Sequence, residues 1–220
     1  MPFFWLLFIG TGFSSSIQLP GMNYSDYLAP GIVGMIILFS SIFAGVSVIW
    51  DRQFGFLKEI LVAPVLRISI VLGKTIGAST IALINGVTML LISILMGLVR
   101  IDINILISPL FMLLIAVCFV SIGLIIASRM RSMEGFQTIM SFVVMPIFFL
   151  SGALFPLNNV PVWMKIASYA DPLTYGIDGM RLSLVGIGMF DIWFDLGILT
   201  IWSLSMLIFG GYIFARSTID

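Results

Sequence analysis

Long apolar runs separated by short polar segments set the pattern of this chain. A helix needs about 20 apolar residues to cross a hydrocarbon core of roughly 30 Å. Five runs reach this length, and they cover residues 31–50, 75–99, 105–128, 136–155 and 192–215. A sixth run, residues 2–17, is apolar as far as Phe13 and then enters three serines. The pattern predicts an all-α polytopic membrane protein, a helical bundle of six spans with a short or truncated first span.

Composition supports a bilayer as the solvent of this bundle. The 220 residues are 60% hydrophobic and 9% charged, whereas ordinary soluble domains are about 45–50% apolar and about 25% charged. We therefore treat residues 1–220 as one transmembrane domain. Ten basic residues balance ten acidic ones, which argues against a nucleic-acid partner because such a partner requires a basic face. With no histidine and one cysteine, Cys118, the chain offers little for a metal site or a disulfide.

Basic residues predict the orientation, because short cytoplasmic loops carry an excess of Lys and Arg. Seven of the ten fall in the loop at 51–74, the turn at 129–131 and the tail after 215. Arg100, Lys165 and Arg181 fall on the opposite side. This alternation predicts six spans with both termini in the cytoplasm. A five-span chain would place the N-terminus outside and leave every later loop on the same side.

The start of the chain also fits a secretory signal peptide, which begins with a positively charged segment. Since no Lys or Arg precedes Arg52, a truncated first membrane helix is the favoured interpretation.

The connection between the last two spans, residues 156–188, is too apolar for an ordinary loop. Prolines divide it, and the pattern predicts short helices at 162–170 and 173–185. Trp163, Tyr169 and Tyr175 are amphipathic aromatics typical of a membrane boundary. We expect re-entrant or interfacial helices that lie in, or dip into, the outer leaflet. A small cap packed over the bundle is the alternative.

Charged chemistry inside the spans is sparse. Asp51, Lys74 and Glu134 lie at span edges, so the sequence shows no mid-membrane charge of the kind that marks an ion pathway. Gly73-Lys74-Thr75 is similar to the end of a phosphate-binding loop, but Ile68 stands where that motif requires glycine. We therefore expect no ATP site on this chain.

Two further features within the spans concern packing. Asn85 lies in mid-span, where its amide needs a partner on another helix, on a second subunit or on a substrate. Gly73 and Gly77 form a GxxxG spacing, which suggests close helix packing at that point.

Residues 51–64 combine charge with an amphipathic pattern. Phe54, Leu57 and Leu61 recur at helical spacing among charged neighbours, and Pro64 ends the segment. Such a helix can rest on lipid head groups or insert into a groove of a soluble partner.

Two segments resemble ABC-2-type transporter permeases of the daunorubicin-resistance kind, which occur in bacteria and archaea. The first is DRQFGFLKEILVAPVLRISIVLGK, residues 51–74. The second carries the pattern P-x-x-F-L-S-G-x-x-F-P at 146–156, then P-x-W at 161–163 and D-P-L-T-Y at 171–175. Both segments stand in the order and topology of that family. The resemblance covers nearly the whole chain.

This resemblance implies a non-catalytic, membrane-spanning permease subunit of an ATP-driven exporter in the prokaryotic plasma membrane. Two copies, in a homodimer or heterodimer, would pair with two separate ATPase subunits that hold ATP and Mg²⁺, and no cofactor is implied on this chain. The substrate would be a hydrophobic compound or a similar molecule. Family members usually begin with a cytoplasmic interfacial helix, whereas Met1 already lies in the apolar pattern. We therefore expect a late start or a fragment.

The resemblance also assigns residues. The loop at 51–64 would supply a coupling helix that contacts the ATPase through Arg52, Phe54, Gly55, Phe56, Lys58, Glu59 and Leu61. The segment at 156–188 would form an outer gate. The outer-gate motif, which begins just before this segment, consists of Gly152, Phe155, Pro156, Trp163, Pro172 and Tyr175.

Two other classes stay open on the residues alone. A membrane scaffold or assembly protein explains the absence of charged pathway residues equally well, but it explains the amphipathic loop only with an unnamed partner. An ion-coupled secondary transporter lacks its expected intramembrane charge.

Overall fold

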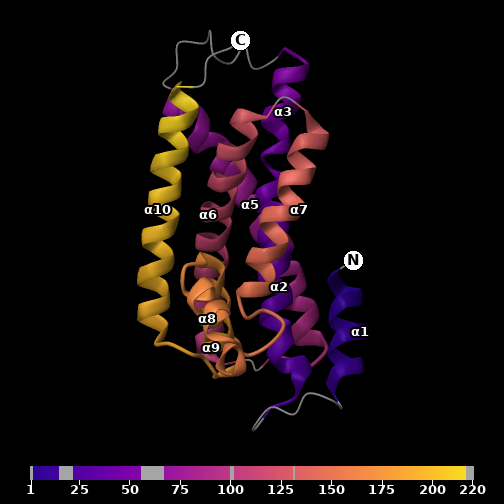
Figure 1. The fold of residues 1–220 in the computed structure, drawn as a ribbon. Coiled ribbons are helices and arrows are strands. Elements are labelled where there is room, and N and C mark those ends of the chain that lie inside the picture. Colours follow the sequence, from indigo (N-terminus) through magenta and orange to yellow (C-terminus); the bar gives the residue numbers. More distant parts are fainter. Residues whose placement is uncertain (1, 15–21, 56–66, 100–101, 131, 217–220) are drawn as a thin grey trace.

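The computed structural model describes residues 2–14, 22–55, 67–99, 102–130 and 132–216. The elements in these ranges are α-helices and two short 3-10 helices, which confirms the all-α fold (Figure 1). The α-helices are α1 (Pro2–Ser14), α2 (Tyr24–Phe43), α3 (Val46–Gln53), α5 (Arg67–Leu95), α6 (Ser108–Arg129), α7 (Met133–Leu150), α8 (Val162–Tyr169), α9 (Pro172–Val185) and α10 (Ile192–Arg216). The 3-10 helices are η1 (Ile103–Ile107) and η2 (Leu157–Asn159).

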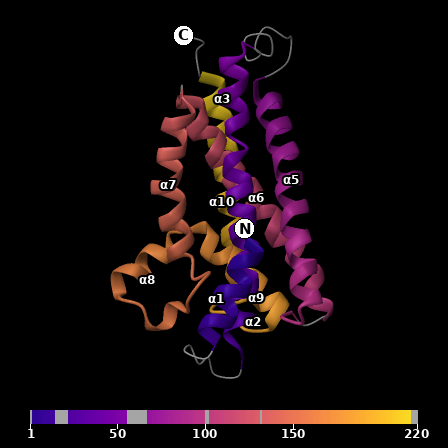
Figure 2. The same ribbon diagram turned by 90° about the vertical axis from the view of Figure 1, so that its right-hand side faces the viewer.

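Five helical segments of the described chain are long and apolar enough to cross a membrane. They are Tyr24–Gln53, Ile68–Leu95, Ile103–Arg129, Met133–Leu150 and Ile192–Ile213. The apolar helix α1 has 13 residues, about 20 Å at 1.5 Å per residue, which is short for a span. The long helices alternate in direction, so α3, the start of α5 and the end of α10 share one end of the bundle (Figures 1 and 2). We call this the α3 end, and we call the opposite end, which holds α8 and α9, the α9 end.

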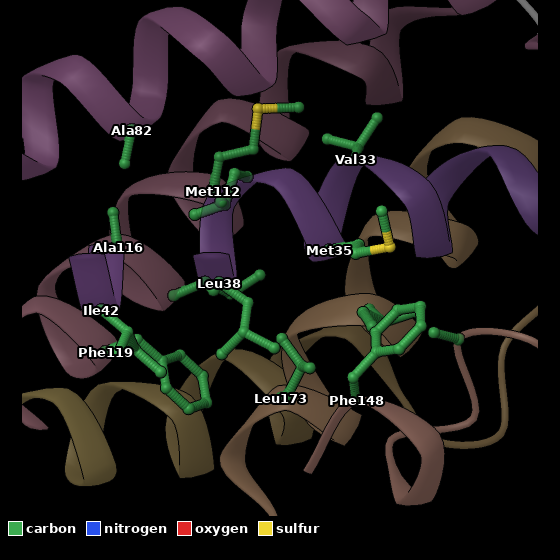
Figure 3. Close-up of a cluster of buried hydrophobic side chains, with 14 of the residues drawn as sticks. Val33, Met35, Leu38, Ile42, Ala82, Met112, Ala116, Phe119, Phe148 and Leu173 are labelled. Carbon is green, nitrogen blue, oxygen red and sulfur yellow. The ribbon is translucent and has the colours of Figure 1, made fainter. Parts of the chain in front are cut away.

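The centre of the bundle is formed by α2 and α6. About two thirds of the most apolar window of each segment is buried, 67% and 61%, against 17–33% for the spans of α5, α7 and α10. Leu38, Ile42, Met112 and Phe119 meet between these helices and their neighbours (Figure 3). Within a bilayer, close van der Waals contact between such side chains stabilises the association of the helices.

The break between α2 and α3 lies where the chain passes close to the backbone of α6. The chain turns at Ala44 and Gly45 and then resumes as α3. A Cβ atom on Gly45 would lie 2.5 Å from the carbonyl oxygen of Gly123 on α6, and one on Gly123 would lie 2.6 Å from the carbonyl oxygen of Ile42. Small residues therefore allow the two backbones to touch at this crossing.

The last connection folds as the predicted pair of short helices, α8 and α9. Proline at the first position and the Asp171 cap, which accepts a hydrogen bond from the Leu173 amide, start α9. Gly186, with φ of 84°, ends it. Twelve of its 14 residues are buried, because α9 is inserted among α2, α6 and α10 at the α9 end (Figure 1). Glycines make the insertion possible, since a Cβ on Gly179 would lie 2.2 Å from the Phe111 ring.

Candidate functional site

The first candidate region is the coupling stem, which we define as residues 51–55 together with Lys74. Arg52 lies in the last turn of α3, and its guanidinium reaches the C-terminal end of α6. Nη1 donates to the Met130 carbonyl and Nη2 donates to the Ser128 carbonyl, each over 2.9 Å. Carbonyls at a helix C-terminus have no partner within the helix, and a cation is favoured there. Arg52 therefore joins the start of the loop to the turn between α6 and α7.

Asp51 joins the same stem to α5. Its Oδ2 accepts a hydrogen bond from Lys74 Nζ over 2.6 Å, and Nζ also lies 3.4 Å from the Ser47 hydroxyl. Both charged side chains are about one-fifth exposed, so the pair is partly shielded from water. Neighbouring residues of α3 thus contact two different helices of the bundle.

The stem ends in two exposed residues. Phe54 is 72% exposed, and Gly55 has a φ of 82° that favours glycine. The remaining residues of the predicted coupling helix, Phe56, Lys58, Glu59 and Leu61, lie outside the described residues. The ATPase contact stays a prediction.

The second candidate region is the α9 latch, which we define as Tyr27, Gly152, Asp178 and Arg181. Arg181 is 5% exposed, and its Nη2 donates to the Gly152 carbonyl over 2.9 Å. Its Nε lies 3.5 Å from the Tyr27 carbonyl, and the guanidinium carbon sits 3.8 Å from the centre of the Tyr27 ring. The Tyr27 hydroxyl donates to the same Gly152 carbonyl over 2.8 Å. One cation thus holds α9 to α2 and to the turn after α7.

Asp178 completes the latch on the same face of α9. Its Oδ2 accepts hydrogen bonds from the Met189 amide over 2.7 Å and the Phe190 amide over 2.9 Å. Its Oδ1 lies 3.8 Å from Arg181 Nη1, an ion pair at i,i+3 spacing. The carboxylate therefore fixes the segment between α9 and α10 through backbone donors.

Sequence reasoning missed this latch and one further charge. Asp195 is completely buried in the first turns of α10, and its charged neighbours include Asp178 and Asp191. It lies in the first turn of α10, at the edge of the candidate span Ile192–Ile213, and the expectation that no charge lies in mid-membrane stays a prediction. The available signal was Asp178 and Arg181 at i,i+3 in a segment otherwise rich in small and apolar residues.

The predicted outer-gate residues fall in three places. Gly152, with φ of 72°, is part of the latch, and Pro156 lies four residues later in the connection after α7. Pro172 is buried at the start of α9, and Tyr175 donates its hydroxyl to the Tyr169 carbonyl over 2.8 Å while its ring stacks on Phe190. Trp163 is 67% exposed on α8, and Phe155 is half-buried. Their role as a gate stays a prediction.

Two packing expectations have clear outcomes in the described residues. Asn85 does have a partner on another helix, since its Nδ2 donates to the Ser40 hydroxyl on α2 over 3.1 Å. It borders a groove of about 420 Å³ that also exposes Lys74 and Ser47. The expectation of close packing at Gly73 and Gly77 was wrong within this chain, because a Cβ on either residue would meet no atom within 4 Å.

Asp171 gives the α9 end a pH dependence that can be measured. Burial raises the pKa of its carboxyl to about 8, although the hydrogen bond from the Leu173 amide lowers it. Between about pH 4 and pH 8 the folded chain therefore holds a proton that the unfolded chain has lost, and stability falls as pH rises through this window. Asparagine caps helices equally well and cannot ionise. The Tm of the wild type should fall between pH 5 and pH 8.5, and Asp171→Asn is expected to make this fall smaller by several degrees.

A matched control for this prediction is Asp102→Asn. Asp102 is exposed and, like Asp171, caps a helix by accepting a backbone hydrogen bond. Its donor is the amide of Ile103. Thermal unfolding in detergent at a series of pH values should show the wild-type slope in the control. If Tm changed with pH equally in Asp171→Asn and in the wild type, the prediction would be contradicted.

Comparison with known proteins gives the chain its family context. Residues 1–185 match the family described as ABC-2 type transporter. A protein of Pyropia yezoensis named as transport permease ycf38 is 30% identical over 187 residues, which cover 82% of this chain and 64% of the relative. Nodulation protein J of Rhizobium leguminosarum bv. trifolii is 26% identical over 204 residues, which cover 91% of this chain and 78% of the relative.

A third relative is named as a multidrug ABC transporter permease, YbhR of Escherichia coli strain K12. It is 25% identical over 160 residues, 72% of this chain and 44% of its own length. The chain thus spans less than two thirds of the length of ycf38 and of YbhR. Since the family match includes the coupling stem and the whole of α9, the chain belongs to the ABC-2 type transporter family.

Proposed function

We propose that this chain is the membrane-spanning permease subunit of an ATP-driven exporter, powered by a separate ATPase subunit. The observation that carries the proposal is the coupling stem. Asp51 and Arg52 tie the base of a charged loop to α5 and to the end of α6, as expected of a loop that receives force from a partner. The same α6 packs against α9 and α10, so a path of packed helices links the stem to the α9 latch.

In the proposed cycle, closure of the ATPase subunits pushes on the loop that follows Phe54. Arg52 passes the movement to the turn between α6 and α7, and Lys74 passes it to α5. Shift of α6 then strains the contacts of α9, which Arg181 and Asp178 hold in place. Transport becomes directional if the substrate binds the inward and outward states with different affinities.

The proposal extends to partners and location. A second permease copy pairs with this one, and the sparsely buried spans of α7 and α10 leave faces for that copy and for lipid. ATP and Mg²⁺ belong to the ATPase subunit, the chain itself is non-catalytic, and the complex lies in a prokaryotic plasma membrane. A hydrophobic compound or a similar molecule is the proposed substrate.

An ion-coupled transporter is the second candidate, because the α9 end holds buried carboxyl groups at Asp178 and Asp195. Buried acids of this kind mark ion pathways in many transporters. However, Asp178 is already compensated by two amide donors and Arg181. Substrate movement driven by a pH gradient in vesicles without any ATPase subunit would favour this second candidate.

The test of the proposed function is an uncoupling variant, Arg52→Gln. Loss of the two charge-assisted hydrogen bonds to α6 should reduce permease-stimulated ATP hydrolysis in proteoliposomes about tenfold. The ATPase subunit should still co-purify, because the Arg52 guanidinium is bonded to α6 and the exposed Phe54 is unchanged. Arg129→Gln is the matched control, since Arg129 is an exposed arginine at the same end of α6. Equal stimulation by both variants and the wild type would overturn the coupling role of Arg52.

A further inference from the structure

A cavity of about 160 Å³ lies beside the α9 latch. Its walls come from the start of α2, the turn after α7, one face of α9 and the segment at 187–189. The volume would hold about five water molecules at roughly 30 Å³ each. The cavity is therefore large enough for a compact chemical group and too small for a whole drug-sized molecule.

Some polar side-chain atoms that line the cavity have free hydrogen-bonding capacity. The hydroxyl oxygen of Thr174 is buried and has no hydrogen-bond partner among the described residues. Arg181 Nη1 approaches Asp178 Oδ1 only to 3.8 Å, beyond hydrogen-bond distance. Asn158, at the rim, is exposed and offers both amide donors and a carbonyl acceptor. Since buried polar groups are nearly always hydrogen-bonded, these groups point to a ligand that supplies donors and acceptors together.

The charge of the cavity favours an uncharged ligand. Arg181 and Asp178 both line it, so their formal charges cancel within the site. An anion would lie close to the Asp178 carboxylate and a cation would lie close to the Arg181 guanidinium, and a buried charge without its own partner is costly. A hydroxyl group can donate to the carboxylate and accept from the guanidinium without adding charge.

The apolar surroundings favour an amphiphile. Met22, Pro156, Leu157, Ile187 and Met189 give the wall apolar side chains. Asn158 stands four residues before Val162, where α8 begins, and α8 exposes Trp163 and Ile166. A tail that leaves the cavity at Asn158 can lie along this exposed apolar helix.

We propose that this cavity is a binding site for the uncharged, hydroxyl-bearing head group of an amphiphile. Binding itself needs no ATPase subunit. The consequence rests on the proposed function: a ligand hydroxyl that accepts from Arg181 Nη1 and donates to Asp178 changes the contacts of the α9 latch when the amphiphile arrives.

The test compares three probes that share one tail. Monooleoylglycerol carries two hydroxyl groups, oleate an anion and oleylamine a cation, and native mass spectrometry of the purified full chain gives each apparent affinity. We expect monooleoylglycerol to bind about tenfold more tightly than either charged probe. Thr174→Val keeps the side-chain shape and should lower the affinity for monooleoylglycerol about three- to tenfold, which corresponds to the loss of one hydrogen bond.

Two further variants keep the result interpretable. Thr200→Val is the matched control, because the Thr200 hydroxyl donates to the Leu196 carbonyl within α10 and does not line the cavity. Asn158→Leu removes a rim amide from an exposed position and should also weaken the hydroxyl probe. Equal affinity for the three head groups would overturn the proposed site. Equal affinity of Thr174→Val and Thr200→Val for monooleoylglycerol would overturn it as well. Permease-stimulated ATP hydrolysis without this binding would leave the proposed function intact and remove only the site.

Discussion

Replacing Arg181 with methionine is expected to lower the free energy of unfolding by about 3–5 kcal/mol, the usual cost when one partner of a buried ion pair is removed. Methionine keeps the apolar stem of the side chain but cannot donate to the Gly152 carbonyl. Asp178 then stays buried without its cationic partner, although the Met189 and Phe190 amides still donate to it. The turn after α7 also loses its tie to α9.

The double variant tests whether the unpaired charge causes this loss. Asp178→Asn in the Arg181→Met background removes the buried charge while an amide oxygen can still accept from the Met189 and Phe190 amides. We therefore expect the double variant to recover part of the lost stability, measured as Tm and as the monodisperse fraction in detergent. Lys165→Met on α8 is the control, because Lys165 has no place in the latch. A single Arg181→Met variant as stable as this control would contradict the account of the latch.

The elements with strong local chemistry could be predicted from the sequence. The predicted helices at 162–170 and 173–185 differ by one residue from α8 and α9, because proline, the Asp171 cap and Gly186 mark their ends. The helix of the second predicted span begins at Tyr24, seven residues earlier than predicted, and contains Pro30 without ending there. A helix end that lies within an apolar stretch has no capping residue or glycine to mark it in the sequence.

Only part of the candidate site could be predicted from the sequence. The position of Asp51 and Arg52 at the edge of a span could be predicted from the sequence, but their partners on α5 and α6 depend on tertiary packing. The latch was missed because Gly152 and Arg181 contribute to it from positions 29 residues apart. The sequence pattern places Arg181 in a short predicted helix outside the spans, whereas the fold buries it against the Tyr27 ring.

The second large effect is expected at the crossing of α3 and α6, where Gly45→Ala should destabilise the chain by about 1–3 kcal/mol, the usual cost of overpacking. Gly45 has helical backbone angles, φ −57° and ψ −28°, so alanine fits the backbone itself. Its Cβ would lie 2.5 Å from the carbonyl oxygen and 2.9 Å from the carbonyl carbon of Gly123. Backbone atoms cannot turn aside as a flexible side chain can, and therefore α3 must move away from α6.

Gly77→Ala on α5 is the matched control, with the opposite expected sign. A Cβ on Gly77 would meet no atom within 4 Å, so this change should leave stability unchanged or raise it by up to about 1 kcal/mol through helix propensity. Tm in detergent measures both variants, and ATPase stimulation measures the consequence for the coupling stem. Since Arg52 reaches the Met130 and Ser128 carbonyls at 2.9 Å, separation of α3 from α6 should lengthen these bonds and weaken coupling together with stability. Equal effects of Gly45→Ala and Gly77→Ala would show that the crossing can relax, and the stem would then transmit force without tight contact between α3 and α6.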